Sequence, residues 1–238
     1  IIQKRELMIP VAPQNIDKSL KEIYYHHFQE RDRIEDKFFG YLKDQNFDLK
    51  ILELDKKNIN SLKTIKFLNE IKPDLVISYG CTKISEKILS NSNADFWNIH
   101  GGLSPYYRGG ITHFWPSYFL EPQMTGMTLH QTTTAIDGGN ILMQTSSKLV
   151  RGDTLHALAS RNVYDFGELL KDFICEIDPC NIPKGIEQKS SGKIFISSDW
   201  RPEHLRLIYD VHHDRIVDKV LDGELVGREP KLAKLIKH

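Results

Sequence analysis

The chain has no excess of charge of either sign and no long apolar run. Lysine plus arginine and aspartate plus glutamate both total 32, so the formal net charge is zero. A protein that grips nucleic acid through its phosphates usually carries a basic excess, so this balance argues against a nucleic-acid partner. No stretch of about 18 apolar residues occurs, and no membrane span is therefore predicted.

Cysteine is also scarce, with only Cys81, Cys175 and Cys180. An odd count with irregular spacing does not suit a disulfide framework and is typical of a reducing compartment, which predicts a cytoplasmic protein. The amino-terminal residues 1–6 lack the layout of a signal peptide, because no apolar core region follows their charges. Neither a His-Glu-x-x-His pattern nor paired cysteines are present, so no metal is predicted.

What the chain does contain is an alternation of apolar segments at strand and helix spacing. The spacing predicts strands at 49–54, 74–78, 96–100 and 126–130, and helices at 23–37, 62–71, 85–89 and 154–176. The charged run 30–37 is interpreted as the solvated face of its helix. Strands alternating with helices are typical of a doubly wound α/β sheet, and the apolar run 74–78 suits a parallel one.

A domain boundary is predicted near residues 178–183, where two prolines interrupt the periodic pattern. Residues 1–178 then form the main domain, and residues 179–238 form a small C-terminal α+β extension. Within the extension we expect a strand at 193–196 and a helical region from Pro202 to Gly223.

Asn98, His100 and Asp137 are the candidate catalytic residues of the chain. Asn98 and His100 lie on the same face of the predicted strand 96–100, because side chains alternate along a strand. Asp137 follows the predicted strand 126–130 and precedes two glycines. An amide, an imidazole and a carboxylate can supply an oxyanion donor, a proton shuttle and a group that orients the shuttle. Singly, each residue is more often structural.

These residues lie in longer motifs. Asn98-x-His100 is followed by Leu103-Ser-Pro-Tyr-Tyr-Arg-Gly-Gly110, then by Thr125-Gly-Met-Thr-Leu-His130 and Ile136-Asp-Gly-Gly-Asn-Ile-Leu142. The series resembles the folate-dependent formyltransferase family over about residues 73–158. The pair Phe114-Trp115 makes the sequence most similar to the branch of the family that formylates amino sugars on nucleotide carriers. A long ordered match is more specific than one short motif.

The resemblance implies a Rossmann-like fold with a mostly parallel sheet, and 10-formyltetrahydrofolate as formyl donor. It implies Asn98, His100 and Asp137 as catalytic residues. Relatives usually begin with one more strand and helix before the strand that Ile1-Ile2 matches, so that first unit is expected to be missing. Two loops are implied to hold the pterin ring. The cofactor-binding residues are then Tyr79, Gly80, Cys81, Ile84, Thr132, Thr133, Thr134 and Ala135.

The loop after His100 is implied to receive the acceptor. Its substrate-binding residues are Gly101, Gly102, Leu103, Ser104, Tyr106, Tyr107 and Arg108. For Arg108, an anion contact and a bracing ion pair within the loop both stay open. Gly101 and Gly102 suit either a tight turn or a close approach to a ligand.

The leading hypothesis is an N-formyltransferase that modifies the primary amine of an amino sugar on a nucleotide. Alternatives with the same chemistry are formylation of glycinamide ribonucleotide or methionyl-tRNA. Water in place of the amine would make the protein a 10-formyltetrahydrofolate hydrolase, and a non-catalytic binding module is the third class. Sugar-modifying relatives are commonly dimers, so a homodimer through the region after Pro183 is a candidate assembly.

Overall fold

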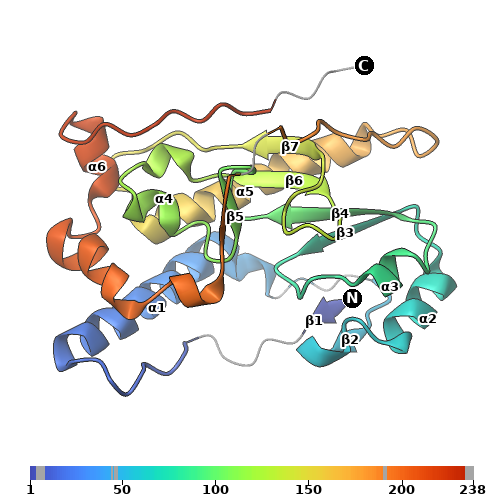
Figure 1. Ribbon diagram of the computed structural model, residues 1–238, viewed down its shortest axis with the longest axis horizontal. Coiled ribbons are helices and arrows are strands. Elements are labelled where there is room, and N and C mark those ends of the chain that lie inside the picture. The colour runs from blue at the N-terminus through green and yellow to red at the C-terminus, as the bar shows by residue number, and fades with distance from the viewer. Residues whose placement is uncertain (4–8, 44, 46–47, 190–191, 234–238) are drawn as a thin grey trace.

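The computed structural model describes residues 1–3, 9–43, 45, 48–189 and 192–233. A four-stranded sheet lies at its centre in the order β3-β4-β6-β7 (Figure 1). Its strands are β3 (Leu75–Tyr79), β4 (Asp95–His100), β6 (Met127–Gln131) and β7 (Ile141–Thr145). β3 and β4 are parallel, whereas β4–β6 and β6–β7 are antiparallel. The expected α/β class is confirmed, with a parallel side and an antiparallel side.

The antiparallel side has a local cause. Only residues 132–140 separate β6 from β7, and such a short connection joins antiparallel neighbours, whereas a parallel pair needs a crossover of a dozen or more residues. The loop that contains Asp137 is therefore a hairpin loop, and it follows Gln131 of β6, which pairs with Trp97 near the start of β4.

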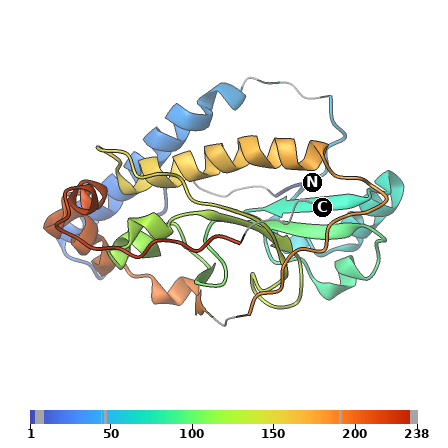
Figure 2. The ribbon, with the colours of Figure 1, turned by 90° about the horizontal axis from the view of Figure 1, so that it is seen from above.

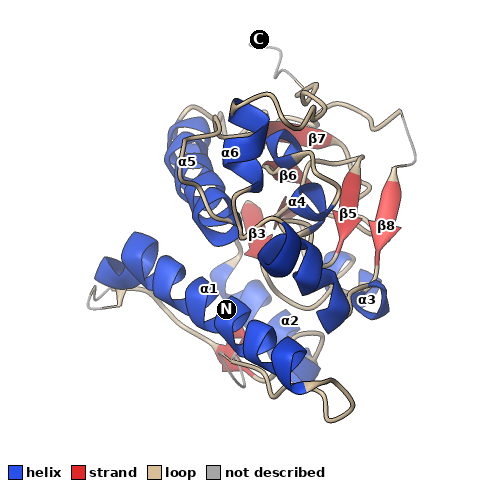
Figure 3. Cartoon of the chain, turned by 90° about the vertical axis from the view of Figure 1, so that its left-hand side faces the viewer, coloured by secondary structure: helices blue, strands red, loops and turns tan. Residues whose placement is uncertain are grey.

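Two small parallel sheets flank the central one. β1 (Ile2–Gln3) pairs with β2 (Glu53–Leu54), so the strand expected at 49–54 is shorter than predicted. Residues of β1 and β3 line an apolar groove of about 640 Å³. β5 (Tyr107–Gly109) pairs with β8 (Lys193–Phe195), and the two lie side by side in Figure 3. The idea of a missing first strand–helix unit stays a prediction.

One long helix covers a face of the central sheet, and a second long helix packs against the first. α1 (Lys18–Phe39) contacts α5 (Leu155–Cys175), and Figure 2 shows α5 along the sheet with α1 crossing beside it. Asp17 and Thr154 cap their first turns by accepting backbone N–H bonds from Leu20 and Ala157. The shorter helices are α2 (Leu62–Ile71), α3 (Glu86–Leu89), α4 (Trp115–Tyr118) and α6 (Ile216–Leu221).

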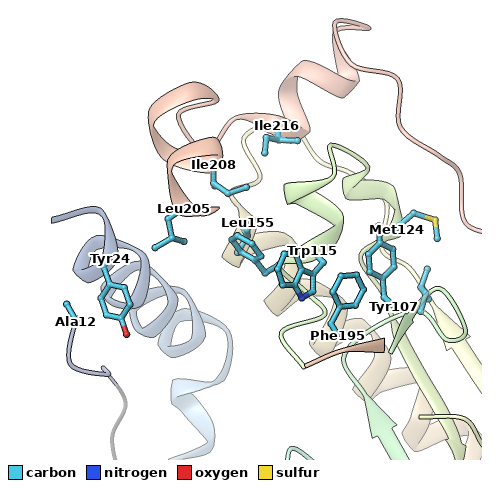
Figure 4. Packing of buried hydrophobic residues seen from close by; sticks show 12 residues of the cluster. Ala12, Tyr24, Tyr107, Trp115, Met124, Leu155, Phe195, Leu205, Ile208 and Ile216 are labelled. Atoms are coloured by element: carbon cyan, nitrogen blue, oxygen red, sulfur yellow. The ribbon is translucent and has the colours of Figure 1, made fainter. Parts of the chain in front are cut away.

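One hydrophobic cluster joins the two sides of the predicted boundary at 178 (Figure 4). Tyr24 of α1 and Tyr107 of β5 share it with Phe195, Leu205 and Ile208 from the C-terminal region. Burying one such side chain stabilises a fold by roughly 1.5–3 kcal/mol. The division into two domains stays a prediction, but the C-terminal residues complete a core that also supports β5.

Candidate active site

Two elements bring the three predicted catalytic residues to one cavity of about 600 Å³. Asn98 and His100 come from the end of β4, and Asp137 comes from the β6–β7 loop. All three line the same cavity. The alternation of side chains on β4 places the amide and the imidazole together, and the hairpin adds the carboxylate.

Asn98 is oriented by two hydrogen bonds. Its Oδ1 accepts from Ser78 Oγ at 2.9 Å, and its Nδ2 donates to His130 Nε2 at 3.2 Å. His130 lies opposite Asn98 in the β4–β6 register, which explains the contact. An amide nitrogen carries two hydrogens, so one remains after the bond to His130. This second N–H is a candidate donor to an oxyanion.

His100 is almost fully buried and its imidazole spans two partners. Nε2 lies 2.7 Å from the carbonyl oxygen of Tyr107, which can only accept, so Nε2 carries the hydrogen. Nδ1 faces Asp137 Oδ2 at 3.4 Å. Burial lowers the pKa of His100 below its ordinary value although the charge of Asp137 opposes this. The imidazole is therefore neutral near pH 7, with a bare Nδ1 toward the carboxylate.

His130 has the same arrangement on the other side of Asp137. Its Nδ1 donates to the carbonyl oxygen of Gln131 at 2.8 Å, and its Nε2 faces Asp137 Oδ1 at 3.4 Å. Asp137 Oδ2 also accepts the N–H of Gly109 at 2.7 Å. Burial raises the pKa of Asp137, but the neighbouring imidazoles of His130 and His100 and the hydrogen bond from the Gly109 N–H together lower it below its usual value.

The consequence is a site that can accept one proton. Asp137 is a carboxylate near neutral pH, the neutral imidazole of His100 presents an unprotonated nitrogen to one of its oxygens, and His130 Nε2 faces the other. A proton entering the site can be held between the carboxylate and either imidazole. A carboxylate flanked in this way is suited to receive a proton from a reacting amine.

The residues predicted to hold the pterin divide into three groups. Tyr79, Gly80 and Cys81 line the cavity beside the three polar residues. Ile84 lies in the wall of the groove between β1 and β3. The remaining four lie in the β6–β7 loop, where Thr132 is half-buried and the others are exposed; these are Thr132, Thr133, Thr134 and Ala135. Lys83 Nζ donates to the Thr134 carbonyl at 2.5 Å, so the two predicted loops are joined.

The predicted substrate residues differ in their surroundings. Gly101 lines the cavity. Gly102 is buried behind His100, and Leu103 and Tyr107 are core residues. Ser104 is buried too, and its hydroxyl donates to the Asp137 carbonyl at 3.2 Å.

Arg108 and Tyr106 lie nearer the C-terminal region. Arg108 Nη2 donates to the Gly192 carbonyl at 3.3 Å, a contact with the backbone rather than with a carboxylate, and both expectations for this residue stay predictions. Tyr106 is half-buried, and the guanidinium of Arg228 lies 5.1 Å from the centre of its ring. Most residues of this loop therefore pack behind the residues that line the cavity and do not line it themselves.

Sequence reasoning missed the wall opposite Asn98. His27, Arg31 and Glu35 of α1 line the cavity with His156 of α5 and Trp200. The interpretation of 30–37 as a solvated face is therefore wrong for Arg31 and Glu35, because α1 packs against α5 and turns one side inward. The i, i+4, i+8 spacing of the three α1 residues was the available signal.

The histidines of this wall are neutral. His27 Nδ1 lies 2.9 Å from Tyr209 Oη and 3.2 Å from His156 Nε2. Burial lowers the pKa of His27 to about 2 and that of His156 to about 4. Uncharged imidazoles and aromatic rings thus form one side of the cavity.

Within the described residues, no group of three or more His, Cys, Asp or Glu side chains is placed to hold a metal ion. In the same part of the chain, no helix combines the length and the apolar character that crossing a bilayer requires.

Comparison with known proteins identifies the family. A sequence model described as formyl transferase matches residues 26–172. The bifunctional polymyxin resistance protein ArnA of Wigglesworthia glossinidia brevipalpis is 38% identical over 150 residues, which are 59% of this chain and 23% of ArnA. The chain thus matches less than a quarter of the length of that curated relative.

Solved structures show the same fold. PseJ of Anoxybacillus kamchatkensis, crystallised with UDP-4,6-dideoxy-4-formamido-L-AltNAc and tetrahydrofolate, is 23% identical with a TM-score of 0.55, covering 76% of this chain and 89% of PseJ. A sugar N-formyltransferase of a Shewanella species is 20% identical with a TM-score of 0.52, covering 93% and 96%. With the family model matching more than half of its length, the chain belongs to the formyl transferase family.

Proposed function

We propose that this protein is an N-formyltransferase that moves a formyl group from 10-formyltetrahydrofolate to the primary amine of an amino sugar on a nucleotide carrier. The observation that carries the proposal is the meeting of Asn98, His100 and Asp137 in one cavity with residues 79–81. In a member of the formyl transferase family, this set supplies the groups that formyl transfer requires.

The roles follow from the hydrogen bonds. As the amine nitrogen forms a bond to the formyl carbon, Asn98 donates its second N–H to the oxygen that gains negative charge. Removing one such donor costs roughly 3–4 kcal/mol of barrier in other enzymes. His100 lies beside the same position, and its Nδ1 and Asp137 receive the proton that the amine loses. Breaking the bond to the folate nitrogen then returns a proton to that nitrogen.

Two features support a folate donor. Tyr79, Gly80 and Cys81 border the cavity at the end of β3, and the Lys83–Thr134 hydrogen bond holds the two pterin loops together. Ligands of open α/β sheets bind outside the carboxyl ends of the parallel strands, where the loop after β3 lies, and the β6–β7 loop reaches the same cavity through Asp137. The PseJ structure with tetrahydrofolate is consistent with this use of the fold.

The opposite wall supports a sugar acceptor. Neutral His27 and His156, the ring of Trp200 and the Arg31–Glu35 side chains combine polar groups with an aromatic face. Small-molecule sites commonly pair apolar surface with a few placed polar groups, and a hydroxyl-bearing ring needs both. The compound bound in the PseJ structure is a nucleotide sugar that carries a formamido group.

One assay tests the proposal. The protein is incubated with 10-formyltetrahydrofolate, with and without a panel of amino-sugar nucleotides, and tetrahydrofolate release is followed. Release that requires an amino-sugar nucleotide supports the proposal. Release without any acceptor supports the hydrolase, and release only with glycinamide ribonucleotide or methionyl-tRNA supports the alternative acceptors. We further propose that the protein is a cytoplasmic homodimer. Sedimentation of the purified protein measures its oligomeric state and tests the second half of this proposal.

A further inference from the structure

Strand β5 holds two of the three catalytic residues through its backbone. The Tyr107 carbonyl accepts the hydrogen of His100 Nε2 at 2.7 Å, and the Gly109 N–H donates to Asp137 Oδ2 at 2.7 Å. The first bond selects the His100 tautomer that leaves Nδ1 bare, and the second fixes the carboxylate that faces it. A small shift of β5 would therefore change the orientation of both groups.

The position of β5 depends on residues far along the chain. β5 pairs in parallel with β8, and Gly110 N–H adds a bond to the Phe195 carbonyl at 2.8 Å. The Tyr107 ring stacks on the Phe195 ring, with centroids 5.7 Å apart and an interplanar angle of 9°. A Cβ at Gly109, whose φ is 93°, would lie 2.0 Å from the Phe195 carbonyl oxygen, so the strands approach as closely as only glycine permits.

A polar cluster fixes the other end of the Tyr107 side chain. The buried Tyr107 hydroxyl donates to Glu121. Arg228, in the segment after α6, binds the same carboxylate with two bonds, Nη2 to Oε1 at 2.8 Å and Nε to Oε2 at 3.1 Å. A two-bond arginine–carboxylate contact fixes geometry better than a single bond. Arg228 also lies over the Tyr106 ring in the same loop.

We propose that Glu121 and Arg228 are positioning residues, which hold Tyr107 so that its carbonyl keeps His100 oriented toward Asp137. The C-terminal segment is then part of the catalytic apparatus rather than an added support. The inference rests on the proposed function for its effect on turnover. Its effect on the His100 imidazole can be measured separately.

The test uses three substitutions that each remove a contact of this cluster, at Tyr107, Glu121 or Arg228, and one conservative variant at Glu121. Tyr107→Phe keeps the ring on Phe195 and removes only the hydroxyl, whereas Glu121→Ala removes the carboxylate. Glu121→Gln still accepts the tyrosine hydrogen bond but loses the two-bond contact with Arg228, so it should rescue only in part. Arg151→Ala is the matched control, because it deletes another two-bond ion pair of the C-terminal region, with Asp222, that does not contact the loop.

We expect kcat to fall about tenfold in Tyr107→Phe and Glu121→Ala, with KM for the acceptor and folate affinity near wild type. The nitrogen NMR signals of His100 should show the Nε2–H tautomer in wild type and a mixed tautomer with a shifted titration midpoint in both variants. Arg228→Ala should show a smaller effect in the same direction. Glu121→Gln should match Arg228→Ala, because both lose the two-bond contact, and Arg151→Ala should resemble wild type in both measurements.

Unchanged His100 signals in folded Tyr107→Phe and Glu121→Ala would overturn the inference. So would an equal loss of kcat in Arg151→Ala, since the effect would then be general destabilisation. Absence of formyl transfer in the wild type would instead refute the proposed function, and the His100 signals would still decide whether Glu121 and Arg228 position this residue.

Discussion

His130 Nε2 lies 3.4 Å from Asp137 Oδ1, on the opposite side of the carboxylate from His100. The same nitrogen accepts the Asn98 amide hydrogen at 3.2 Å. His130 therefore links the proposed oxyanion donor to the proposed proton acceptor, and it contacts both residues directly.

His130→Phe should lower kcat/KM by roughly 10²-fold, because Asn98 loses its orienting acceptor and Asp137 loses a partner. Folate binding should persist, as measured by fluorescence titration. His212→Phe, which replaces a buried histidine outside the cavity, serves as the control. Equal activities in the two variants would exclude His130 from the mechanism.

His100→Ala and Asp137→Ala should each lose most turnover while still binding folate. Positioned acid–base groups typically contribute about 10²–10⁴-fold, which sets the expected loss. Single-turnover measurement of formyl transfer separates this loss from binding. A wild-type rate in either variant would contradict the mechanism.

The acid limb of the kcat/KM profile should lie below pH 6.5. Burial lowers the pKa of His100, and the pKa of Asp137 is also below its ordinary value, so both are in their basic forms at neutral pH. Activity should fall only when acid protonates this pair. A pH series with a saturating donor measures the limb, and a midpoint above 6.5 would show that another group controls the rate.

Gly102→Ala should be far more damaging than Gly101→Ala. A Cβ at Gly102 would lie 2.6 Å from both His100 Nε2 and the Tyr107 carbonyl oxygen, so it would break the bond between them. A Cβ at Gly101 would meet the His113 ring at 3.1 Å. We expect about a 10²-fold loss of kcat for Gly102→Ala and roughly 1–3 kcal/mol of lost stability.

Gly101→Ala should retain most activity, because the His113 side chain can move by a few tenths of an ångström. Parallel activity assays and thermal melts compare the two variants. If Gly102→Ala were as active as Gly101→Ala, the packing behind His100 would not control its orientation.

His156→Asn should flatten the pH dependence of stability between pH 6.5 and 4. The folded pKa of His156 is lowered to about 4 by burial, so the unfolded chain binds more protons there and wild-type stability falls as the pH falls. The contribution of this one residue reaches about 3 kcal/mol at pH 4. The variant lacks the titrating group.

Wild type and His156→Asn need to be compared directly, because Asp214 changes the stability of both proteins with pH in the opposite direction. Burial raises its pKa to about 7, so the folded state binds more protons and gains relative stability on acidification. Urea unfolding at several pH values gives both curves. Parallel curves for wild type and His156→Asn would show that His156 does not titrate as expected.

Local patterns in the sequence were sufficient for much of the fold. The helix expected at 62–71 matches α2, the long helix expected at 154–176 matches α5, and the strand expected at 96–100 matches most of β4. Periodicity is a property of neighbouring residues, so it can be recognised without knowing the fold. The short strand β5 carries no such period and was not predicted.

The placement of Asn98 and His100 on one face of β4 was determined by the sequence itself, because alternation along a strand requires it. Only the tertiary structure decided that His130 lies opposite Asn98, that α1 turns Arg31 inward and that Arg228 binds Glu121 across 107 positions of chain. Such contacts depend on how separate elements pack into a common core. Local spacing does not encode that choice, since the free energy of packing belongs to the whole chain.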